Sequence, residues 1–143
     1  MRVMHVAQVP PSVTVDSTVM DVVRMLARAG LGAAAVMDGD QLVGIISERD
    51  VMLRVVAERL DPDTTLVRDV MTSPVKTVPA ETGTDETMAV MVSNHIRHVM
   101  IVNEQGSVVG IASFRNVYQA HVEDVENQLN TLHQYIATDC PGG

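Results

Sequence analysis

Two stretches of the chain repeat one pattern of apolar and polar positions. They are residues 43–51 (VGIISERDV) and 109–117 (VGIASFRNV), and each runs from an apolar segment into a polar corner. The corner side chains are Ser47, Arg49 and Asp50 in the first copy and Ser113, Arg115 and Asn116 in the second. A short apolar run predicts a buried strand, and the polar residues after it predict the start of a helix. Each stretch is therefore expected to be a strand that leads into a helix.

The residues before each stretch repeat as well, which indicates an internal duplication. In each half a β-branched run, a helically spaced apolar stripe, an apolar strand and a turn follow one another. These segments are 13–15, 19–26, 33–37 and 38–40 in the first half, and 75–79, 84–92, 98–102 and 103–106 in the second. The pattern predicts the order β-α-β-β-α in each half.

Three strands and two helices make a small unit, which buries little apolar surface by itself. Two such units packed sheet to sheet would cover each other's exposed apolar faces. The expected fold class is therefore α+β, with two pseudo-twofold-related β-α-β-β-α repeats and a long C-terminal helix. We assign residues 1–60 and 70–122 to the repeats, with a linker at 61–69, a helical extension at 123–138 and a disordered tail at 139–143.

Apolar residues recur at alternating intervals along the last predicted helix, which covers about residues 114–137. They are Tyr118, Val122, Val125, Leu129, Leu132 and Ile136. This spacing is that of an a/d seam a little over two heptads long. The seam either packs on its own domain or meets its copy in a homodimer. Because two heptads are too few to form a stable coiled coil alone, the seam would assist an interface rather than create one.

Composition narrows the range of partners. The 143 residues carry a net charge of −8, which argues against a nucleic-acid or anionic-membrane surface. An anionic ligand must therefore meet locally placed cations. Aromatic residues make up only 2% of the chain, so a bound base would lie between aliphatic side chains. The single cysteine, Cys140, excludes a disulfide framework within the chain. Neither a signal peptide nor an apolar run of about 20 residues is present, so the expected location is cytoplasmic.

The two repeats resemble a pair of CBS domains, named after cystathionine β-synthase. The features that carry the resemblance are Val-Met at the front of each repeat (Val3-Met4 and Val70-Met71) and the pattern Gly-hydrophobic-hydrophobic-Ser-x-x-Asp at the back. The resemblance covers about residues 3–122. It implies a disc-like and usually dimeric module, whose clefts bind adenosine-containing ligands such as AMP, ADP, ATP or S-adenosylmethionine. It also implies that the module regulates an attached or partner protein.

The resemblance implies that Ser47 and Asp50 contact the ribose hydroxyls of the ligand. A carboxylate accepts hydrogen bonds from both hydroxyls of a cis-diol, so the chemistry agrees. It further implies that the opposite repeat contributes its first strand and the residues before its second strand. The remaining residues of this expected nucleotide site are Arg49, Lys76, Thr77, Val78, Pro79, Ile96, Arg97, His98 and Met100. Among them Lys76, Arg97 and His98 are expected to meet phosphates, and Val78 and Met100 to flank the base.

A second, weaker cleft is expected at the corresponding place in the other repeat. Its residues are Ser12, Val13, Ser113, Arg115 and Asn116. Asn116 stands where the pattern has an acid, and it carries no charge. The counterparts on the opposite repeat (Ser12, Val13, Gly32 and Ala33) include no cation. We therefore predict an asymmetric module with one competent site.

Other interpretations of these residues stay open. In one alternative Asp50 only caps the helix that begins near Glu48, since acids are favoured there. For Arg49 and Arg115 the alternative is a solvated side chain or a pair with a neighbouring acid. His95 and His98 are spaced for one helical turn, but no cysteine or carboxylate joins them at the spacing of metal ligands, so we expect no metal. No catalytic constellation is present either, so the chain is not expected to be an enzyme.

The expected function is that of a stand-alone regulatory module that binds an adenine nucleotide or an S-adenosylmethionine-like molecule. The nucleotide is a regulatory ligand, and no other cofactor is expected. Occupancy would be passed to an unidentified effector protein or to the arrangement of the homodimer. One alternative is a structural or dimerisation module whose degenerate clefts bind no nucleotide. A weaker alternative is a small enzyme, such as a metal-dependent hydrolase.

Overall fold

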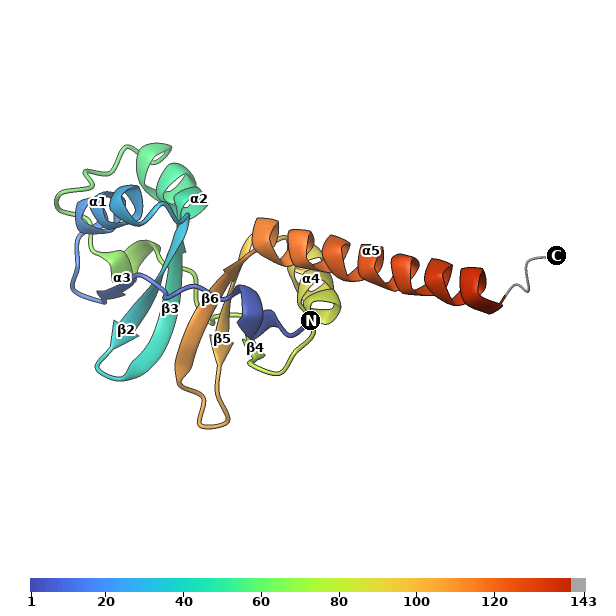
Figure 1. Cartoon of the computed structure of the whole chain (residues 1–143). Coiled ribbons are helices and arrows are strands. Elements are labelled where there is room, and N and C mark those ends of the chain that lie inside the picture. Colours follow the sequence, from blue (N-terminus) through green and yellow to red (C-terminus); the bar gives the residue numbers. More distant parts are fainter. Residues whose placement is uncertain (140–143) are drawn as a thin grey trace.

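A computed structural model describes residues 1–139 of the chain. The tail predicted to be disordered (139–143) lies outside the described residues, apart from Asp139, which is the last residue of the final helix. Cys140 lies outside them as well. Within the described residues the helices and strands follow the duplicated order expected from the sequence (Figure 1).

Within residues 1–139, six strands form two three-stranded sheets of identical topology. The first sheet contains β1 (Ser12–Thr14), β2 (Ala33–Asp38) and β3 (Gln41–Ser47), and the second contains β4 (Thr77–Pro79), β5 (His98–Val102) and β6 (Val108–Ser113). In each sheet the short first strand pairs parallel with the second, which pairs antiparallel with the third. The registers repeat as well, because Val36 lies opposite Gly44 in one hairpin and Ile101 opposite Gly110 in the other.

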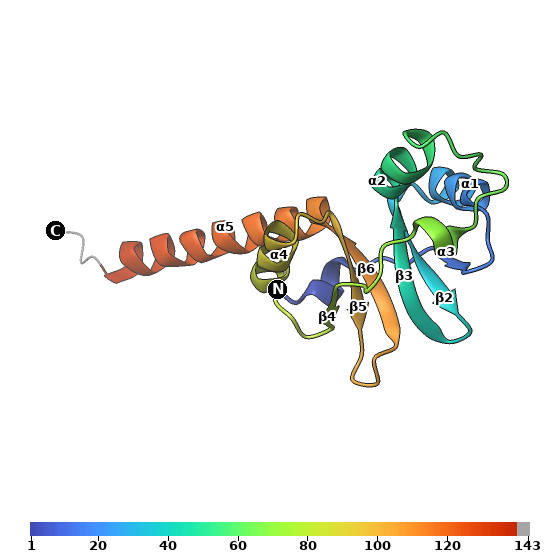
Figure 2. The ribbon, with the colours of Figure 1, turned by 180° about the vertical axis from the view of Figure 1, so that it is seen from behind.

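The helices lie on the outer faces of the two sheets (Figures 1 and 2). They are the 3-10 helix η1 (Val3–Val6), α1 (Val19–Ala29), α2 (Glu48–Val51), the π-helix η2 (Met52–Val56), α3 (Val67–Val70), α4 (Thr84–Ser93) and α5 (Phe114–Asp139). Helix α3 occupies the end of the segment that the sequence predicted as linker. Thr18 begins α1 with a capping box that includes Asp21, and Gly30 ends it in the left-handed conformation (φ 66°).

The apolar residues form three clusters that follow the strand period of two. On β2, Ala34 and Val36 pack against the helices of the first repeat, whereas Ala33 and Ala35 face the other way. This other face forms a shared cluster with Met100 and Ile111 of the second sheet. The two sheets therefore pack against each other, which confirms the predicted fold class.

The two repeats exchange their first segments. Val3 belongs to the core of the second repeat, and the Val3 amide donates to the Thr82 carbonyl at 2.7 Å. In the same way Val67 and Val70, which begin the second half, belong to the core of the first repeat. The chain then crosses back to β4 through residues 71–76. This connector runs along the boundary between the repeats.

Helix α5 divides into two parts. Its first part packs against α4 and η1, and there Val117 and Ala120 are buried. From Val125 to Thr138 every residue is exposed, and the helix projects away from both sheets (Figures 1 and 2). Packing on its own domain therefore accounts for the first part only. No helix within residues 1–139 combines the length and apolar character needed to cross a membrane.

Candidate functional site

A cleft of about 750 Å³ lies between the two repeats. The first repeat contributes Gly32 and residues between 45 and 54, and the other walls come from the connector and from residues 95–98, where β5 begins. Seven of the predicted nucleotide-site residues line it, namely Ser47, Arg49, Asp50, Lys76, Ile96, Arg97 and His98. The structure thus brings together side chains from both repeats around one hollow.

The corner between β3 and α2 positions Ser47 and Asp50. The Asp50 amide donates to Ser47 Oγ at 3.2 Å, and the Ser47 amide donates to Asp50 Oδ2 at 2.9 Å. This reciprocal pair is a capping box, so Asp50 does cap the helix. Asp50 is only 8% exposed and also lines the cleft. Asp50 therefore both caps the helix and lines the cleft.

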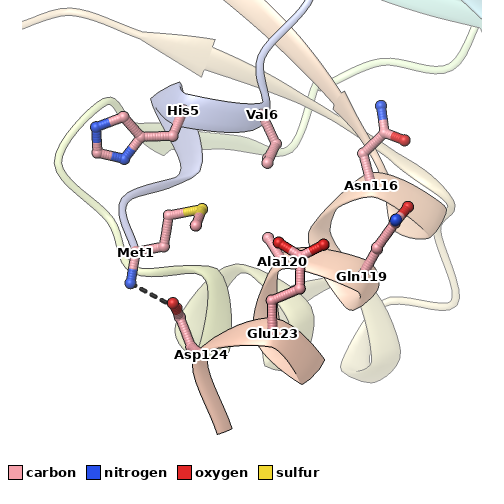
Figure 3. Close-up of a pocket in the computed structure, with 8 residues that line it drawn as sticks. All are labelled: Met1, His5, Val6, Asn116, Gln119, Ala120, Glu123 and Asp124. Carbon is pink, nitrogen blue, oxygen red and sulfur yellow. Dashed lines mark hydrogen bonds and ion pairs between the residues drawn. The ribbon is translucent and has the colours of Figure 1, made fainter. Parts of the chain in front are cut away.

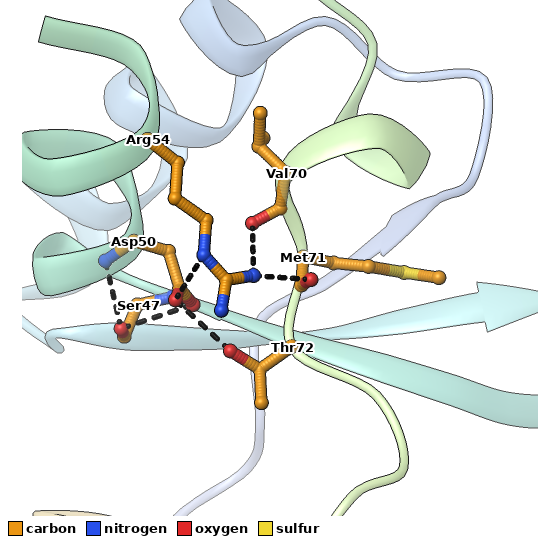
Figure 4. A network of polar contacts seen from close by, with 6 residues as sticks. All are labelled: Ser47, Asp50, Arg54, Val70, Met71 and Thr72. Carbon is orange, nitrogen blue, oxygen red and sulfur yellow. Dashed lines mark hydrogen bonds and ion pairs between the residues drawn. The ribbon is translucent and has the colours of Figure 1, made fainter. Parts of the chain in front are cut away.

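The Asp50 carboxylate is also tied to the connector (Figure 4). Thr72 Oγ1 donates to Asp50 Oδ1 at 2.9 Å, and Arg54 Nε lies 3.9 Å from the same oxygen. Arg54 Nη1 in turn donates to the carbonyl oxygens of Val70 and Met71, at 3.1 and 2.7 Å. A carboxylate offers about four acceptor positions. The Ser47 amide and hydroxyl and the Thr72 hydroxyl already donate to this carboxylate, the Ser47 hydroxyl at 3.1 Å. A ligand diol that reaches Asp50 therefore competes with a side chain already bound there.

Cations line the same cleft as this carboxylate. Arg49 comes from α2, Lys76 from the connector and Arg97 from the segment before β5, and all three are exposed. The charge of Glu48 partly offsets theirs. In a chain with a net charge of −8, this is a local concentration of positive charge. It supplies the local cations that an anionic ligand would need.

His98 stands half-buried at the start of β5. Burial lowers the pKa of His98 below its ordinary value of 6.5; the charge of Glu48 opposes this effect and that of Arg97 adds to it. Gly32 leaves room for the imidazole, because a Cβ at this position would lie 2.9 Å from His98 Cε1. The Glu48 amide donates to the Gly32 carbonyl at 2.9 Å, which fixes this wall of the cleft.

Four predicted residues lie outside the cleft lining. Val78 is 3% exposed and packs in the core of the second repeat, and its neighbours Thr77 and Pro79 are exposed on β4. Met100 is fully buried in the cluster between the two sheets. Neither Val78 nor Met100 is among the residues that line the cleft. The chain leaves the cleft at Lys76, one residue before β4 begins, so the β4 residues are absent from its lining.

The sequence interpretation included only Lys76 of the connector, and it missed the second turn of the helix after β3. Thr72, Pro74 and Val75 line the cleft in place of the β4 residues, and Arg54 joins them. Arg54 follows Asp50 by one helical turn, a spacing that could have indicated it. The apolar lining is aliphatic, as the composition implied. It includes Ile45, Leu53, Val75 and Ile96.

The residues of the predicted second cleft are more dispersed. Ser113 Oγ accepts a hydrogen bond from the Asn116 amide at 3.3 Å, so the helix-capping half of the motif persists. Val13 is 6% exposed and belongs to the core of the first repeat. Ser12 and Arg115 are exposed on the surface.

Asn116 lies instead beside a hollow of about 700 Å³ between η1 and α5 (Figure 3). His5, Glu123 and Asp124 also line this hollow, and the Met1 amino group lies 2.7 Å from Asp124 Oδ2. Its two carboxylates make it a poor place for an anion. The cleft between the repeats is therefore the stronger candidate. Among residues 1–139, no three His, Cys, Asp or Glu side chains are grouped to hold a metal ion.

Comparison with known proteins gives the family. The family model of the CBS domain matches residues 3–57 and 67–123. An uncharacterised protein of Methanopyrus kandleri is 28% identical over 123 residues, which cover 83% of this chain and 63% of the relative. The mitochondrial CBS domain-containing protein CBSX3 of Arabidopsis thaliana is 34% identical over 128 residues, which cover 86% of this chain and 62% of the relative. The chain therefore spans a little over three-fifths of the length of these two relatives.

A solved structure agrees with both the sequence match and the fold. A CBS domain protein from Pyrobaculum aerophilum complexed with AMP superposes with a TM-score of 0.73 at 32% identity, over 81% of this chain and 89% of that one. Proteins with paired CBS domains are regulatory ligand-binding modules. The duplicated fold, the cleft between its halves and the two matched segments lead to one conclusion: this chain belongs to the CBS-domain family and carries two CBS domains in tandem.

Proposed function

We propose that the chain senses an adenine nucleotide in the cleft between its two repeats and passes this occupancy to a partner protein. The observation that carries the proposal is that a carboxylate and several cations line one cleft. The Asp50 carboxylate comes from the first repeat, and Lys76, Arg97 and His98 stand on the connector and the second repeat. A nucleoside phosphate carries the matching groups, the diol of its ribose and the anion of its phosphate.

In this arrangement each part of the ligand meets a different wall. The ribose hydroxyls donate to Asp50, and Ser47 completes the set of hydrogen bonds. The phosphates meet the cations, which form charge-assisted hydrogen bonds with them. The base lies among the aliphatic residues Ile45 and Val75. The AMP complex of the Pyrobaculum relative supports this class of ligand.

The charges of the cleft also rank the candidate ligands. S-adenosylmethionine carries a positive sulfonium where AMP, ADP and ATP carry phosphates. Lys76 and Arg97 would repel that group and attract a phosphate. A phosphorylated ligand is therefore the better match, and its affinity should fall as salt is added, because both cations are exposed.

The signal would travel through the connector. Thr72 donates to Asp50 at 2.9 Å, so a ligand that takes over Asp50 weakens the hold on residues 71–76. These residues join the two repeats, so their release changes which relative geometry of the repeats is favoured. A ligand shifts such an equilibrium only by its difference in affinity for the two states. The partner protein would recognise the favoured geometry.

A structural module that binds no nucleotide is the alternative. The observation that favours it is the complete engagement of Asp50, whose contacts with Ser47, Thr72 and Arg54 need no ligand. A thermal-shift titration separates the two functions. A ligand at 100 times its dissociation constant adds about 2.7 kcal/mol to the free energy of unfolding. AMP, ADP or ATP should therefore raise the melting temperature, and no shift with any of them would favour the structural module.

Asp50→Asn and Asp21→Asn form a matched pair for this titration. Asp21 belongs to the capping box of α1, in which the Asp21 amide donates to Thr18 Oγ1 at 3.2 Å, and it is not among the cleft residues. Both variants lose a capping carboxylate, but only Asp50→Asn changes the cleft. We expect Asp50→Asn to weaken nucleotide binding at least about tenfold, through loss of a charged acceptor. Equal affinities in the two variants would contradict the proposed role of Asp50.

A further inference from the structure

The exposed part of α5 carries an apolar stripe that nothing in the described chain covers. The stripe consists of Val125, Leu129, Leu132 and Ile136, which are 41%, 49%, 52% and 50% exposed. They continue the heptad spacing that starts at Tyr118, itself 53% exposed. The part of α5 that carries the stripe projects away from the two sheets, as Figures 1 and 2 show from opposite sides.

A single helix of this kind is poorly stabilised by itself. Isolated helices shorter than about 12–15 residues are marginal in water, and most helices depend on the burial of an apolar face. Residues 125–138 have no such burial. A partner that covers the stripe would supply it.

We propose that this stripe binds the same stripe of a second copy of the chain, in a parallel two-helix seam. An a/d seam is complementary to itself, because each apolar residue packs into the matching layer of its copy. The a positions hold Val122, Leu129 and Ile136, and the d positions hold Tyr118, Val125 and Leu132. Three of these six, the β-branched Val122 and Ile136 at a and Leu132 at d, match the combination that favours two parallel helices. The proposal does not depend on nucleotide binding.

The flanking charges favour the parallel direction. With Leu129 at an a position, His121 falls at g and Glu126 at the following e. In a parallel pair these two positions face each other across the seam, which places an imidazole beside a carboxylate. In the antiparallel pair that uses the same six apolar layers, Glu126 would face its own copy. That contact between like charges disfavours the antiparallel pair.

The length of the seam also favours the parallel direction. A specific interface buries at least about 1,000 Å² in total, which is demanding for a seam of two heptads. In a parallel pair the globular parts of both copies lie at the same end of the seam. Tyr118, at the end of the stripe nearest the sheets, then meets its copy, and neighbouring surfaces can add to the buried area.

The oligomeric state tests the docking surface. Sedimentation equilibrium at micromolar concentration should give a dimer for the full chain and a monomer for Leu129→Glu. The matched control is Asn130→Glu, which adds the same charge at the next residue, outside the seam. This variant should remain dimeric, and circular dichroism should show that both variants keep their sheets and helices. A monomeric full chain, or a dimeric Leu129→Glu variant, would overturn the proposal.

Disulfide trapping tests the direction. Leu132→Cys, in a Cys140→Ser background, should form a disulfide-linked dimer on mild oxidation, because a parallel seam places residue 132 beside its copy. In the antiparallel pair the two copies of residue 132 would stand about 15 Å apart along the axis, at the rise of an α-helix. A disulfide needs Cα atoms closer than about 7 Å. Failure of Leu132→Cys to cross-link, together with efficient cross-linking of mixed Val125→Cys and Leu129→Cys chains, would refute the parallel arrangement.

Discussion

At the scale of single residues, the carboxylate of Asp50 makes two kinds of contact at the cleft. Asp50 caps α2 through Ser47 and accepts the Thr72 hydroxyl from the connector. The cap alone would not require burial, since the equivalent Asp21 in α1 is exposed. Asp50 is buried because the connector passes over it. The residue that the motif identifies therefore stands where the two repeats meet.

His98 gives the cleft a dependence on pH. Burial lowers the pKa of His98 in the folded chain, so between that pKa and about 6.5 the unfolded chain binds more protons. The free energy of unfolding should therefore decrease as the pH falls below about 6.5. Urea titrations of the ligand-free chain and of His98→Gln, which keeps the polar side chain without the titration, measure this contribution. An unchanged pH dependence in His98→Gln would contradict it.

Nucleotide binding should depend on pH in the opposite direction. A phosphate beside His98 favours the charged imidazole and raises the pKa of His98 in the complex. Binding then takes up a proton, so the affinity for AMP or ATP should increase as the pH falls from about 8 to 6. Titration calorimetry across this range checks the effect. An equal pH dependence in His98→Gln would show that another group, such as the phosphate itself, is responsible.

At the scale of secondary structure elements, the connector and η2 are held together by Arg54. Its guanidinium donates to the Val70 and Met71 carbonyls and lies near Asp50. Arg54→Ala removes these contacts, and because Arg54 is about half-exposed we expect a loss of about 1 kcal/mol. Arg24→Ala, on the exposed face of α1, should change the free energy of unfolding much less. Urea unfolding of both variants measures the difference, and equal losses would mean that the contacts of Arg54 contribute nothing.

The elements themselves were largely predictable from the sequence, for local reasons. The hairpins were marked by turn residues between apolar runs, such as 38–40, and the duplication gave each assignment a second, independent copy. The connector was not predictable in this way. Residues 71–76 have no periodic pattern, and their position depends on which repeat α3 packs against. That is a tertiary contact between distant parts of the chain.

The difference between local signals and tertiary contacts also explains which of the predicted residues line the cleft. Ser47, Arg49 and Asp50 lie on one local turn, so the motif placed them correctly in the cleft. Val78 and Met100 depend on the direction in which a strand residue faces. Both point into cores, Met100 into the layer between the sheets. A shift of one residue along a strand reverses that direction, and the sequence pattern alone did not resolve it.

At the scale of the whole molecule, the contact between the sheets makes the two repeats one folding unit. Met100 is fully buried in that contact, whereas Met52 is 57% exposed. Met100→Ala should lower the free energy of unfolding by about 2–5 kcal/mol, from lost burial and the cavity left behind. Met52→Ala, the matched control, should change it by less than about 1 kcal/mol. If Met100→Ala behaved like Met52→Ala, the sheet-to-sheet contact would not be a major source of stability.

The exchange of first segments between the repeats also makes the site depend on both halves of the chain. Val67 and Val70 are buried in the first repeat although they begin the second half of the chain. The walls of the cleft are therefore supplied by both halves, and neither half holds a complete site. This is why occupancy of the cleft is suited to report on the relative position of the repeats.

The most direct test of this account is the stoichiometry of nucleotide binding by the intact chain. Titration calorimetry with AMP and with ATP should give one ligand per chain, held by the cleft that contains Asp50. Asp50→Asn should abolish most of the heat, and Asp21→Asn should preserve it. Two equal sites per chain, or no heat with either nucleotide, would contradict the account.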